Sequence, residues 1–313
     1  MPAMFVALPP FSTQTPATAW QPALAHQCGL GESPYWCTAR QELVWADIPG
    51  CELLAWSASG GLRRWAVPSN PGCVVPTSQG GYAIGLRDGV YTAAHWGGPL
   101  RKRWAFEVPA GVDPKSLRLN DGKADLQGRF WVGSYSERRE ATAQLFCLQA
   151  SGEGFAVVHE ESGFAASNGL AFGSNLMSWA NTAAHALELR HCNPAKKATL
   201  QFNPKPAGWE SAADPAHQHY QGRPDGACMD SQGCVWVALF EGGAVIRVSP
   251  AGQVLERIQT PCLKPTMPCL GGEDLRTLFI TSAQNPGEPL GGSVWQVCVS
   301  VAGLPVGLVS TNF

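Results

Sequence analysis

Short stretches of aromatic and β-branched residues recur along the chain, and a polar turn joins each of them to a second apolar stretch. The pattern is seen in QELVWADIPGCELLAWSASGGL, in GRFWVGSYSERREATAQLFCLQASGEG and in GCVWVALFEGGAVIRVSPAGQV. Runs of about five such residues between Gly, Pro and Asn are typical of β-strands joined as hairpins. No window has the sustained apolar spacing that an amphipathic helix needs. The pattern therefore predicts an all-β protein.

This unit recurs six times, and its first apolar stretches begin near Leu43, Tyr82, Phe130, Met177, Val235 and Leu278. A separation of roughly 40 to 60 residues is the size of one propeller blade, and a β-sandwich or a helical repeat explains the recurrence less well. We therefore predict a single six-bladed β-propeller domain over residues 1–313, with an N-terminal extension at 1–25 that could close the last blade.

The composition supports strands and excludes several classes of partner. The chain has 35 Gly, 25 Pro and 12 Trp, a net charge of −2 and 15% charged residues, so it offers no basic surface for nucleic acid or membrane lipid. Its 11 cysteines include no C-x-x-C pair. The N-terminal residues lack a secretory signal, and no apolar run reaches the roughly 18 residues of a membrane span. We expect a cytoplasmic monomer or weak homo-oligomer with reduced thiols.

Four polar clusters precede apolar stretches, where the pattern places loops that lead into the inner strands of the blades. LGESPYW contains Glu32, AASNGLAF contains Asn168, and GRPDGACMDSQGCVW contains Asp225. SLRLNDGKADLQGRFW contains Arg118 and Asn120. Equivalent positions in propeller blades surround one central channel, so these side chains should converge there. Carboxylate and amide oxygens suit a hard divalent cation.

Taken one at a time, the same residues have simpler interpretations. Asn-Gly at 168–169 and Asp-Gly at 225–226 are common turn dipeptides, and Glu32 could be a solvated turn acid. Asp121 and Asp125 are predicted to form Asx turns. What favours a metal site is the joint occurrence of carboxylate, amide and carboxylate in equivalent blades, with a turn at 168–169 that presents the amide.

The motifs GESPYW, RLNDGKAD, GRFWVG, SNGLAF and RPDGA resemble those of the SMP-30/gluconolactonase/regucalcin-like family, and they occur in the family's order over most of the chain. The resemblance implies a six-bladed propeller with one divalent cation (calcium, magnesium, manganese or zinc). It implies that Glu32, Asn168 and Asp225 bind this cation. It also implies that Arg118 and Asn120 contact the substrate.

Two departures from the family's motifs concern the substrate. Many relatives have G-T-M after the GRFW strand, followed by an acidic residue that contacts the sugar. This chain has GSYSERRE, so Tyr135 replaces Met, and Glu137 is our candidate for the acid unless the position is lost to Arg138. The fourth unit has Asn181 where Asp is usual. The resemblance therefore indicates the cation site more fully than the substrate.

For function, the resemblance implies a hydrolase that opens a sugar lactone to its aldonic acid. The cation would polarise the carbonyl and activate water, and Asp225 is the candidate general base. The chain has no G-x-S-x-G motif, which argues against a serine hydrolase. Two alternatives stay open, a non-sugar lactone or phosphotriester as substrate, and a non-catalytic calcium-binding propeller.

The polar insertion at 202–224 is predicted to be an active-face loop, and its His217 and His219 lack partners for a second metal site.

Overall fold

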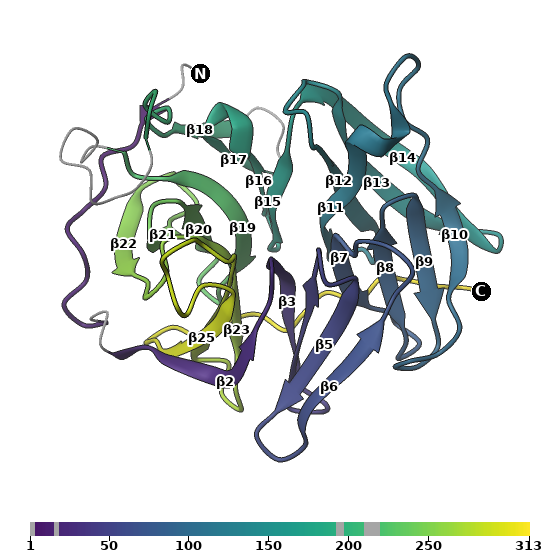
Figure 1. Cartoon of the computed structure of the whole chain (residues 1–313), viewed down its shortest axis with the longest axis horizontal. Helices are drawn as coiled ribbons and strands as arrows, with labels where there is room; N and C mark the ends of the chain where they lie inside the picture. The colour runs from purple at the N-terminus through teal and green to yellow at the C-terminus, as the bar shows by residue number, and fades with distance from the viewer. Residues whose placement is uncertain (1–3, 16–18, 192–196, 210–219) are drawn as a thin grey trace.

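The computed structural model describes residues 4–15, 19–191, 197–209 and 220–313, and most of these residues lie in β-strands. Six sheets are arranged as the blades of a ring, which confirms the predicted six-bladed β-propeller (Figure 1). The helices η2 (Pro114–Ser116) and η3 (Thr182–Ala184) are single 3-10 turns. No helix within the described part of the chain is long and apolar enough to cross a membrane. His217 and His219 lie outside the described residues.

The strands of the first three blades follow one another in chain order, from the channel to the rim. Blade 1 contains β3 (Gly31–Cys37), β4 (Glu42–Asp47), β5 (Glu52–Ser57) and β6 (Gly61–Ala66). Blade 2 contains β7 (Cys73–Pro76), β8 (Tyr82–Leu86), β9 (Gly89–Ala93) and β10 (Arg101–Ala105). Blade 3 contains β11 (Leu117–Ala124), β12 (Phe130–Ser136), β13 (Ala143–Ser151) and β14 (Gly154–Phe164).

The remaining blades include two strands from the N-terminal region. Blade 4 contains β15 (Ser167–Phe172), β16 (Leu176–Asn181), β17 (Ala186–His191) and β18 (Lys197–Gln201), and β1 (Met4–Phe5) is added parallel to β18. Blade 5 contains β19 (Arg223–Met229), β20 (Val235–Phe240), β21 (Ala244–Val248) and β22 (Val254–Gln259). Blade 6 contains β23 (Pro265–Gly271), β24 (Thr277–Ser282) and β25 (Ser293–Cys298), with β2 (Gln21–Gln27) as its outer strand.

The apolar stretches that the sequence analysis used to count the blades are the second strands, from β4 to β24. The innermost strands precede them, and they contain the polar clusters that had been placed in loops. That placement was wrong for a physical reason. In β3, β11, β15, β19 and β23 the register to the second strand shifts partway along the innermost strand, so a β-bulge interrupts the apolar–polar alternation that marks a strand in sequence.

The Asn-Gly pair at 168–169 shows what the bulge does. It lies within β15, whose register to β16 shifts between Asn168 and Ala171, and it is not the turn that its sequence predicts. Gly169 has a φ of 63°, in the left-handed region that favours glycine. A Cβ atom there would lie 2.7 Å from the Cβ of Ala180 and 3.0 Å from the carbonyl oxygen of Asp225. The glycine therefore allows β15 to approach blade 5 while the side chain of Asn168 faces the channel.

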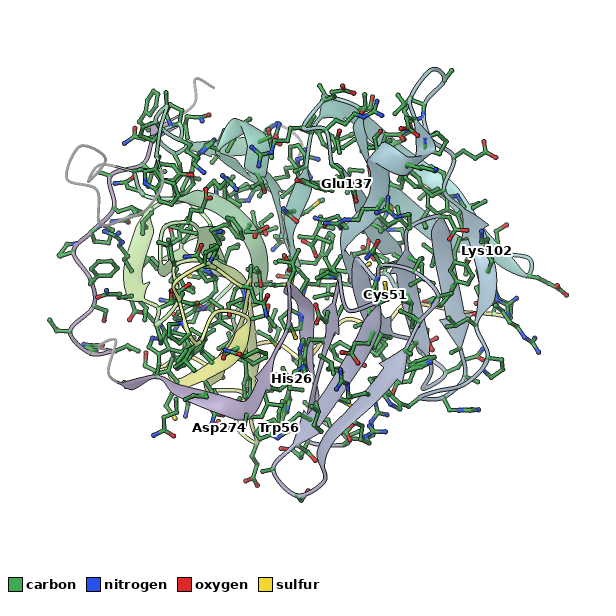
Figure 2. All side chains as sticks on the ribbon, viewed as in Figure 1. His26, Cys51, Trp56, Lys102, Glu137 and Asp274 are labelled. Carbon is green, nitrogen blue, oxygen red and sulfur yellow. The ribbon has the colours of Figure 1, made fainter. Side chains whose placement is uncertain are left out.

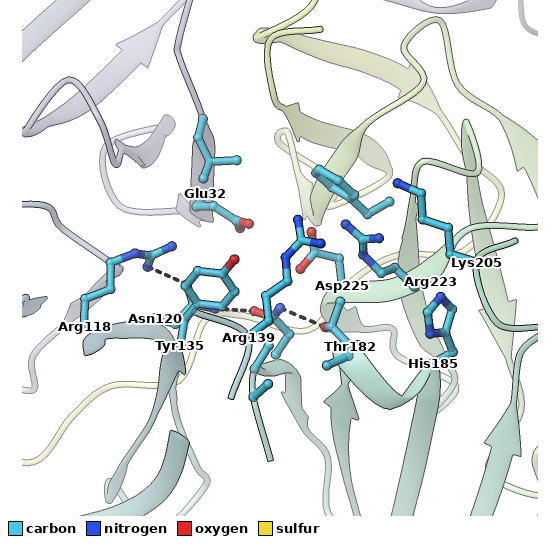
Figure 3. A pocket seen from close by; sticks show the side chains of 16 residues that line it. Glu32, Arg118, Asn120, Tyr135, Arg139, Thr182, His185, Lys205, Arg223 and Asp225 are labelled. Carbon is cyan, nitrogen blue, oxygen red and sulfur yellow. Dashed lines mark hydrogen bonds between the residues drawn. The ribbon is translucent and has the colours of Figure 1, made fainter. Parts of the chain in front are cut away.

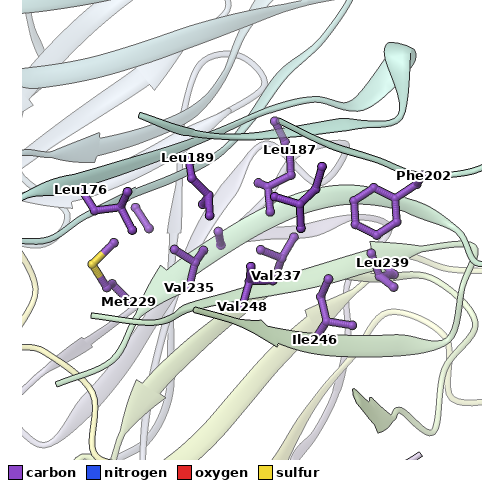
Figure 4. Close-up of a cluster of buried hydrophobic side chains, with 14 of the residues drawn as sticks. Leu176, Leu187, Leu189, Phe202, Met229, Val235, Val237, Leu239, Ile246 and Val248 are labelled. Carbon is purple, nitrogen blue, oxygen red and sulfur yellow. The ribbon is translucent and has the colours of Figure 1, made fainter. Parts of the chain in front are cut away.

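Neighbouring blades pack face to face through apolar side chains. Between blades 4 and 5, Leu187 and Phe202 pack in one cluster with Val237, Leu239 and Ile246, all fully buried (Figure 4). Burying an aliphatic or aromatic side chain of this size contributes roughly 1.5–3 kcal/mol. Side chains fill the blade interfaces throughout the ring (Figure 2). This packing fixes the innermost strands, and with them the positions of the polar side chains that they direct into the channel.

Both ends of the chain are built into the ring. β2 pairs antiparallel with β25, with Gln21 opposite Gln296 and Gln27 opposite Ser293. Residues 300–313, which we call the C-terminal strap, bridge the blades at the ends of their innermost strands, where Gly303 pairs with Asp230 and Val309 with Thr77. Figure 1 shows this yellow trace running past β3 and β7 to the C-terminus.

Candidate active site

A cavity of about 460 Å³ opens at the end of the ring where the innermost strands begin, opposite the C-terminal strap. Its volume is within the range of small-molecule sites. All five residues predicted to converge on the channel line it: Glu32, Arg118, Asn120, Asn168 and Asp225. Figure 3 shows the cavity and labels all of them except Asn168. They come from β3, β11, β15 and β19, so four blades contribute to one site.

The two carboxylates of the cavity are buried and have no ion-pair partner in the described part of the chain. Glu32 is 8% exposed and Asp225 is 6% exposed, and neither forms an ion pair with any described residue. Burial, and then the charges of Asp225 and Asp121, hold the pKa of Glu32 well above its usual value. Burial also raises the pKa of Asp225 to about 7, although Arg223 opposes this rise. Two buried acids that disfavour each other's ionised form suit a site that binds a cation between them.

The amide of Asn168 is held in one orientation by its neighbours. Its Oδ1 atom accepts a hydrogen bond of 2.5 Å from Nδ2 of Asn120, and its Nδ2 atom donates to Oγ1 of Thr182 at 2.9 Å. An amide oxygen has two lone pairs, so Oδ1 keeps one acceptor position beyond the bond from Asn120. Asn168 can therefore supply a neutral oxygen ligand.

These bonds belong to a chain of hydrogen bonds that runs across three blades. Arg118 donates from Nη1 to Oδ1 of Asn120 at 2.7 Å, and Asn120 donates to Asn168. Asn168 donates to Thr182, whose hydroxyl donates to the carbonyl oxygen of Pro224 at 2.8 Å. The chain links blade 3 to the segment of blade 5 that carries Asp225. It holds the substrate candidates and the metal-ligand candidates as one rigid unit.

Asp121 does not form the Asx turn predicted for it. It lies in the bulge of β11, is 2% exposed, and accepts a hydrogen bond of 2.9 Å from the backbone N–H of Leu170 in the next blade. Burial raises its pKa to about 6. Its charge is one of the causes that raise the pKa of Glu32 and of Asp225. Asp125, by contrast, does cap a turn, with its Oδ1 accepting from the N–H of Gln127 at 2.9 Å.

Glu137 and Arg138, the two candidates for the family's acidic position, do not line the cavity. Oε1 of Glu137 lies 2.6 Å from Nη2 of Arg87 and 3.9 Å from Nε of Arg118. Arg138 forms an ion pair of 2.6 Å with Asp113. Tyr135, which replaces the family's Met, does line the cavity, and its ring centroid lies 4.9 Å from Cζ of Arg118.

Several cavity residues were not named by the sequence analysis. Arg139, Thr182, His185 and Lys205 line the cavity but belong to no polar cluster before an apolar stretch, and Arg223 belongs to one but was not singled out. Arg139, Thr182 and His185 follow the second strand of a blade, and Lys205 lies in the insertion predicted to be an active-face loop, where the local sequence does not show which side chain reaches the channel. Arg223 could have been found, because it is two residues before Asp225 on β19 and alternate residues of a strand share a face.

Among the residues that the structure describes, no group of three or more His, Cys, Asp and Glu side chains could hold a metal ion. A cation in this cavity would therefore rely on Glu32 and Asp225 together with the amide of Asn168. The ten cysteines within the described ranges are all free. The donor set is oxygen-rich, which favours calcium, magnesium or manganese over a site of the His and Cys type.

Fold and site define a six-bladed propeller with a carboxylate–amide cluster at the mouth of its channel. The family model described as the SMP-30/gluconolactonase/LRE-like region matches residues 30–284, and the chain belongs to this family of sugar lactonases and regucalcins. A 6-deoxy-6-sulfogluconolactonase from Pseudomonas putida is 37% identical over 88% of this chain and 92% of its own. Regucalcin from Danio rerio is 30% identical over 81% of this chain and 83% of its own.

Solved structures share the fold. A crystal structure of regucalcin from Agrobacterium tumefaciens, described as a calcium-binding protein, aligns with a TM-score of 0.74 over 91% of this chain and 95% of its own, at 22% identity. A gluconolactonase from Xanthomonas campestris aligns with a TM-score of 0.62 over 88% of this chain and 87% of its own, at 18% identity. Because both structures are less than 25% identical to this chain, their similarity shows that the fold is shared and nothing more.

Proposed function

We propose that this protein is a divalent-metal-dependent lactonase, which hydrolyses a sugar lactone to the corresponding aldonic acid. One observation carries the proposal: two buried carboxylates, Glu32 and Asp225, share a cavity with the fixed amide of Asn168 and have no ion-pair partner in the described residues. The family supports lactone hydrolysis, and the name of the P. putida relative, a sulfogluconolactonase, supports a sugar lactone as the substrate class.

Glu32, Asn168 and Asp225 would hold the cation, with water completing its shell. When bound, a divalent cation polarises the lactone carbonyl and lowers the pKa of a coordinated water. Arg118 and Asn120 orient the ring. Nη1 of Arg118 is engaged by Asn120, and its remaining donors are available to lactone and hydroxyl oxygens.

Asp225 is the proton carrier of the proposed reaction. Its carboxylate accepts a proton as the oxygen of water attacks the carbonyl carbon. The bond from that carbon to the ring oxygen then breaks, and the ring oxygen takes the proton to become a hydroxyl group. The product is a single aldonic acid, which carries both the new carboxyl group and the new hydroxyl group, and its carboxyl group ionises at neutral pH. Burial raises the pKa of Asp225 to about 7 in the metal-free protein, and a bound cation would lower it.

The test is acid release from a panel of lactones, measured as a fall in pH with added calcium, magnesium or manganese and again with EDTA. Metal-dependent hydrolysis of glucono-1,5-lactone or a related aldonolactone is the expected result. Asp225→Ala should lose both metal binding and turnover, and unchanged hydrolysis by this variant would overturn the assignment of Asp225.

Two other outcomes correspond to specific alternatives. The altered GSYSERRE segment, which places Tyr135 in the cavity, favours a non-sugar lactone or a phosphotriester. Hydrolysis of only such esters would support that substrate. The structural neighbour described as calcium-binding favours a non-catalytic role. Calcium binding without hydrolysis of any ester in the panel would support this role.

A further inference from the structure

The cavity has more positive charge than a neutral sugar requires. Of the residues that the structure describes, four cationic side chains line it, from Arg118, Arg139, Lys205 and Arg223, against two acids, Glu32 and Asp225. Both acids are assigned to the metal in the proposed function, so a bound divalent cation would balance them. The cationic side chains then remain as an excess of positive charge around the substrate.

Arg139 has no ion-pair partner in the described part of the chain. The residue is exposed, and its guanidinium forms no hydrogen bond, ion pair or ring contact with any residue that the structure describes. Its backbone φ is 59°, which is uncommon for a residue with a side chain, and its N–H closes a turn onto the carbonyl of Ser136 at 2.9 Å. Glycine would suit this conformation better, yet the position holds a long cationic side chain that lines the cavity.

Lys205 and Arg223 also line the cavity, and together with Arg139 they form a group of cations that we call the cationic wall. Nζ of Lys205 lies 2.9 Å from Oε1 of Glu241, and Nη1 of Arg223 lies 2.7 Å from Oε2 of the same residue. Among the described residues these two cations share one carboxylate, so the three side chains together have a net positive charge. Arg223 stacks on Phe240, with Cζ 4.9 Å from the ring centroid, and Lys205 lies 4.6 Å from the ring centroid of Trp209. These contacts fix both heads in place.

Three of the four cationic side chains lie on one side of the cavity. In Figure 3 the heads of Arg139, Arg223 and Lys205 lie on the side of Asp225, and Arg118 lies on the other side next to Asn120. A lactone whose ring is held by Arg118 and Asn120 would therefore extend its far end toward the three cations.

We propose that the substrate is an anionic lactone, whose sulfonate, phosphate or carboxylate group lies away from the carbonyl and binds to Arg139 and the Lys205–Arg223 pair. This inference rests on the proposed function, because it takes the lactone ring to be held by Arg118 and Asn120. Guanidinium and ammonium groups donate charge-assisted hydrogen bonds to such oxyanions, and these are stronger than bonds to sugar hydroxyls.

The first experiment compares lactones that share one carbon skeleton. Metal-loaded protein is assayed with glucono-1,5-lactone, its 6-phosphate, its 6-deoxy-6-sulfonate and glucaro-lactone. We expect kcat/KM to be about 10- to 100-fold higher for at least one anionic lactone, mainly through KM. The advantage should shrink as NaCl rises from about 0.05 M to about 0.5 M, because salt screens exposed charges. The ranking of the three anions shows which oxyanion the wall accepts.

The second experiment uses a matched pair of variants. Arg139→Gln removes the unpaired guanidinium, and we expect the ratio of anionic to neutral kcat/KM to fall about tenfold. Arg138→Gln is the control, since this neighbouring side chain pairs with Asp113 and does not line the cavity, so it should leave the ratio unchanged. Equal losses in both variants, or no preference for anions in the wild type, would overturn the inference.

Direct binding separates this inference from the proposed function. Titration calorimetry with gluconate and 6-phosphogluconate, the open-chain acids, needs no turnover. Tighter binding of 6-phosphogluconate that depends on Arg139 would support the cationic wall even if no lactone were hydrolysed, in which case only the proposed function fails. Hydrolysis of neutral and anionic lactones at equal rates would retain the proposed function and overturn the anionic substrate. If the protein neither bound 6-phosphogluconate more tightly than gluconate nor hydrolysed any lactone, both the proposed function and the anionic substrate would be overturned.

Discussion

Asn168 shows why the chemistry of a residue depends on its neighbours. As an amide it accepts from Asn120 and donates to Thr182, and a carboxylate could not make the second of these bonds. It is also neutral, so a cation held by Glu32, Asn168 and Asp225 would face two negative charges and not three. A cation with fewer anionic ligands remains a stronger Lewis acid.

Asn168→Asp should keep or tighten divalent-cation binding while lowering lactone turnover about tenfold or more, because the added charge weakens the Lewis acid. Calorimetry with manganese and steady-state hydrolysis measure the two effects. Thr182→Val is the control, since it removes the hydrogen bond to Asn168 without adding charge. Turnover by Asn168→Asp that equals or exceeds the wild-type rate would contradict this account.

The raised pKa of Asp225 makes the stability of the metal-free protein depend on pH. An unfolded Asp titrates near 3.9, and the folded group has a pKa of about 7. Between these values the folded state keeps a proton that the unfolded state has lost. The contribution of Asp225 is therefore favourable at about pH 4 and is lost as the pH rises to about 7, by up to about 4 kcal/mol.

Urea unfolding of EDTA-treated protein across this pH window measures the effect. Asp225→Asn, which resembles the protonated acid, should show a smaller pH-dependent fall than the wild type, and the part that remains comes from Glu32 and Asp121, whose pKa values are also raised. Saturating calcium or manganese should restore stability at pH 7, because it binds the ionised carboxylates of the folded state. A wild-type slope equal to that of Asp225→Asn would show that this group does not titrate as described.

The sequence predicted the residues that stand in motifs and missed those that folding alone brings to the cavity. Glu32 and Asp225 could be found because each precedes an apolar strand in a recurring position. Arg139 and Lys205 were not singled out, although the GSYSERRE segment and the insertion at 202–224 were both predicted to lie near the site, because the sequence of a connection does not show which of its side chains reaches the channel. Asp121 was assigned to a turn because its N-D-G context suits one, and the partner that holds it, the N–H of Leu170, belongs to another blade.

At the scale of elements, a buried aspartate organises the turn between the two inner strands in blades 3 and 5. Asp230 is fully buried and accepts hydrogen bonds from the N–H of Gln232, the N–H of Cys234 and Nε1 of Trp236, at 2.9, 3.0 and 3.0 Å. It also forms an ion pair of 2.7 Å with Arg247. Asp125 makes the same set of bonds in blade 3, to the N–H groups at 127 and 129 and the indole at 131.

Asp230→Ala should lower the free energy of unfolding by about 3–5 kcal/mol, because it leaves a buried cation and several donors without partners. Chemical denaturation measures the loss. Asp274→Ala is the matched control, since Asp274 is an exposed turn aspartate in blade 6 that accepts from the N–H of Arg276 (Figure 2). We expect a cost of about 1 kcal/mol or less for the control. Similar losses for both variants would contradict the role given to Asp230.

The same scale shows the limit of reading strands from sequence. The second strands are long apolar runs, such as β20, and their recurrence was sufficient to count six blades. The innermost strands carry bulges at functional positions, so their alternation is broken where the site is built. The residues that build the site are the ones that would otherwise continue the apolar–polar alternation, so the sequence does not show a strand at these positions.

At the scale of the whole molecule, the C-terminal strap ties together blades that are not neighbours in sequence. The N–H of Ser310 donates to the carbonyl of Gly128 in blade 3 at 2.8 Å, and the N–H of Ser231 in blade 5 donates to Ala302 at 2.9 Å. Val309 is fully buried against the core of blades 2 and 3. The strap therefore covers the end of the channel that lies away from the cavity.

Removal of the strap after Ser300 should destabilise the protein by about 2 kcal/mol or more, through the loss of the buried Val309 and the inter-blade hydrogen bonds. Thermal unfolding in saturating metal measures the change. Removal of Asn312 and Phe313 alone is the control, and it should cost much less. A full truncation with an unchanged melting temperature would show that the blades hold the ring without the strap.

The pairing of β2 with β25 also sets an order of events during synthesis. β2 is made before the strands of blades 1 to 5, whereas its partner β25 follows all of them, so blade 6 cannot be completed until the other five blades have been synthesised. Until then the nascent chain carries an unpaired strand edge at each end of an open ring, and such edges favour aggregation. The yield of folded protein should therefore depend on translation rate and on chaperones that shield the waiting strand.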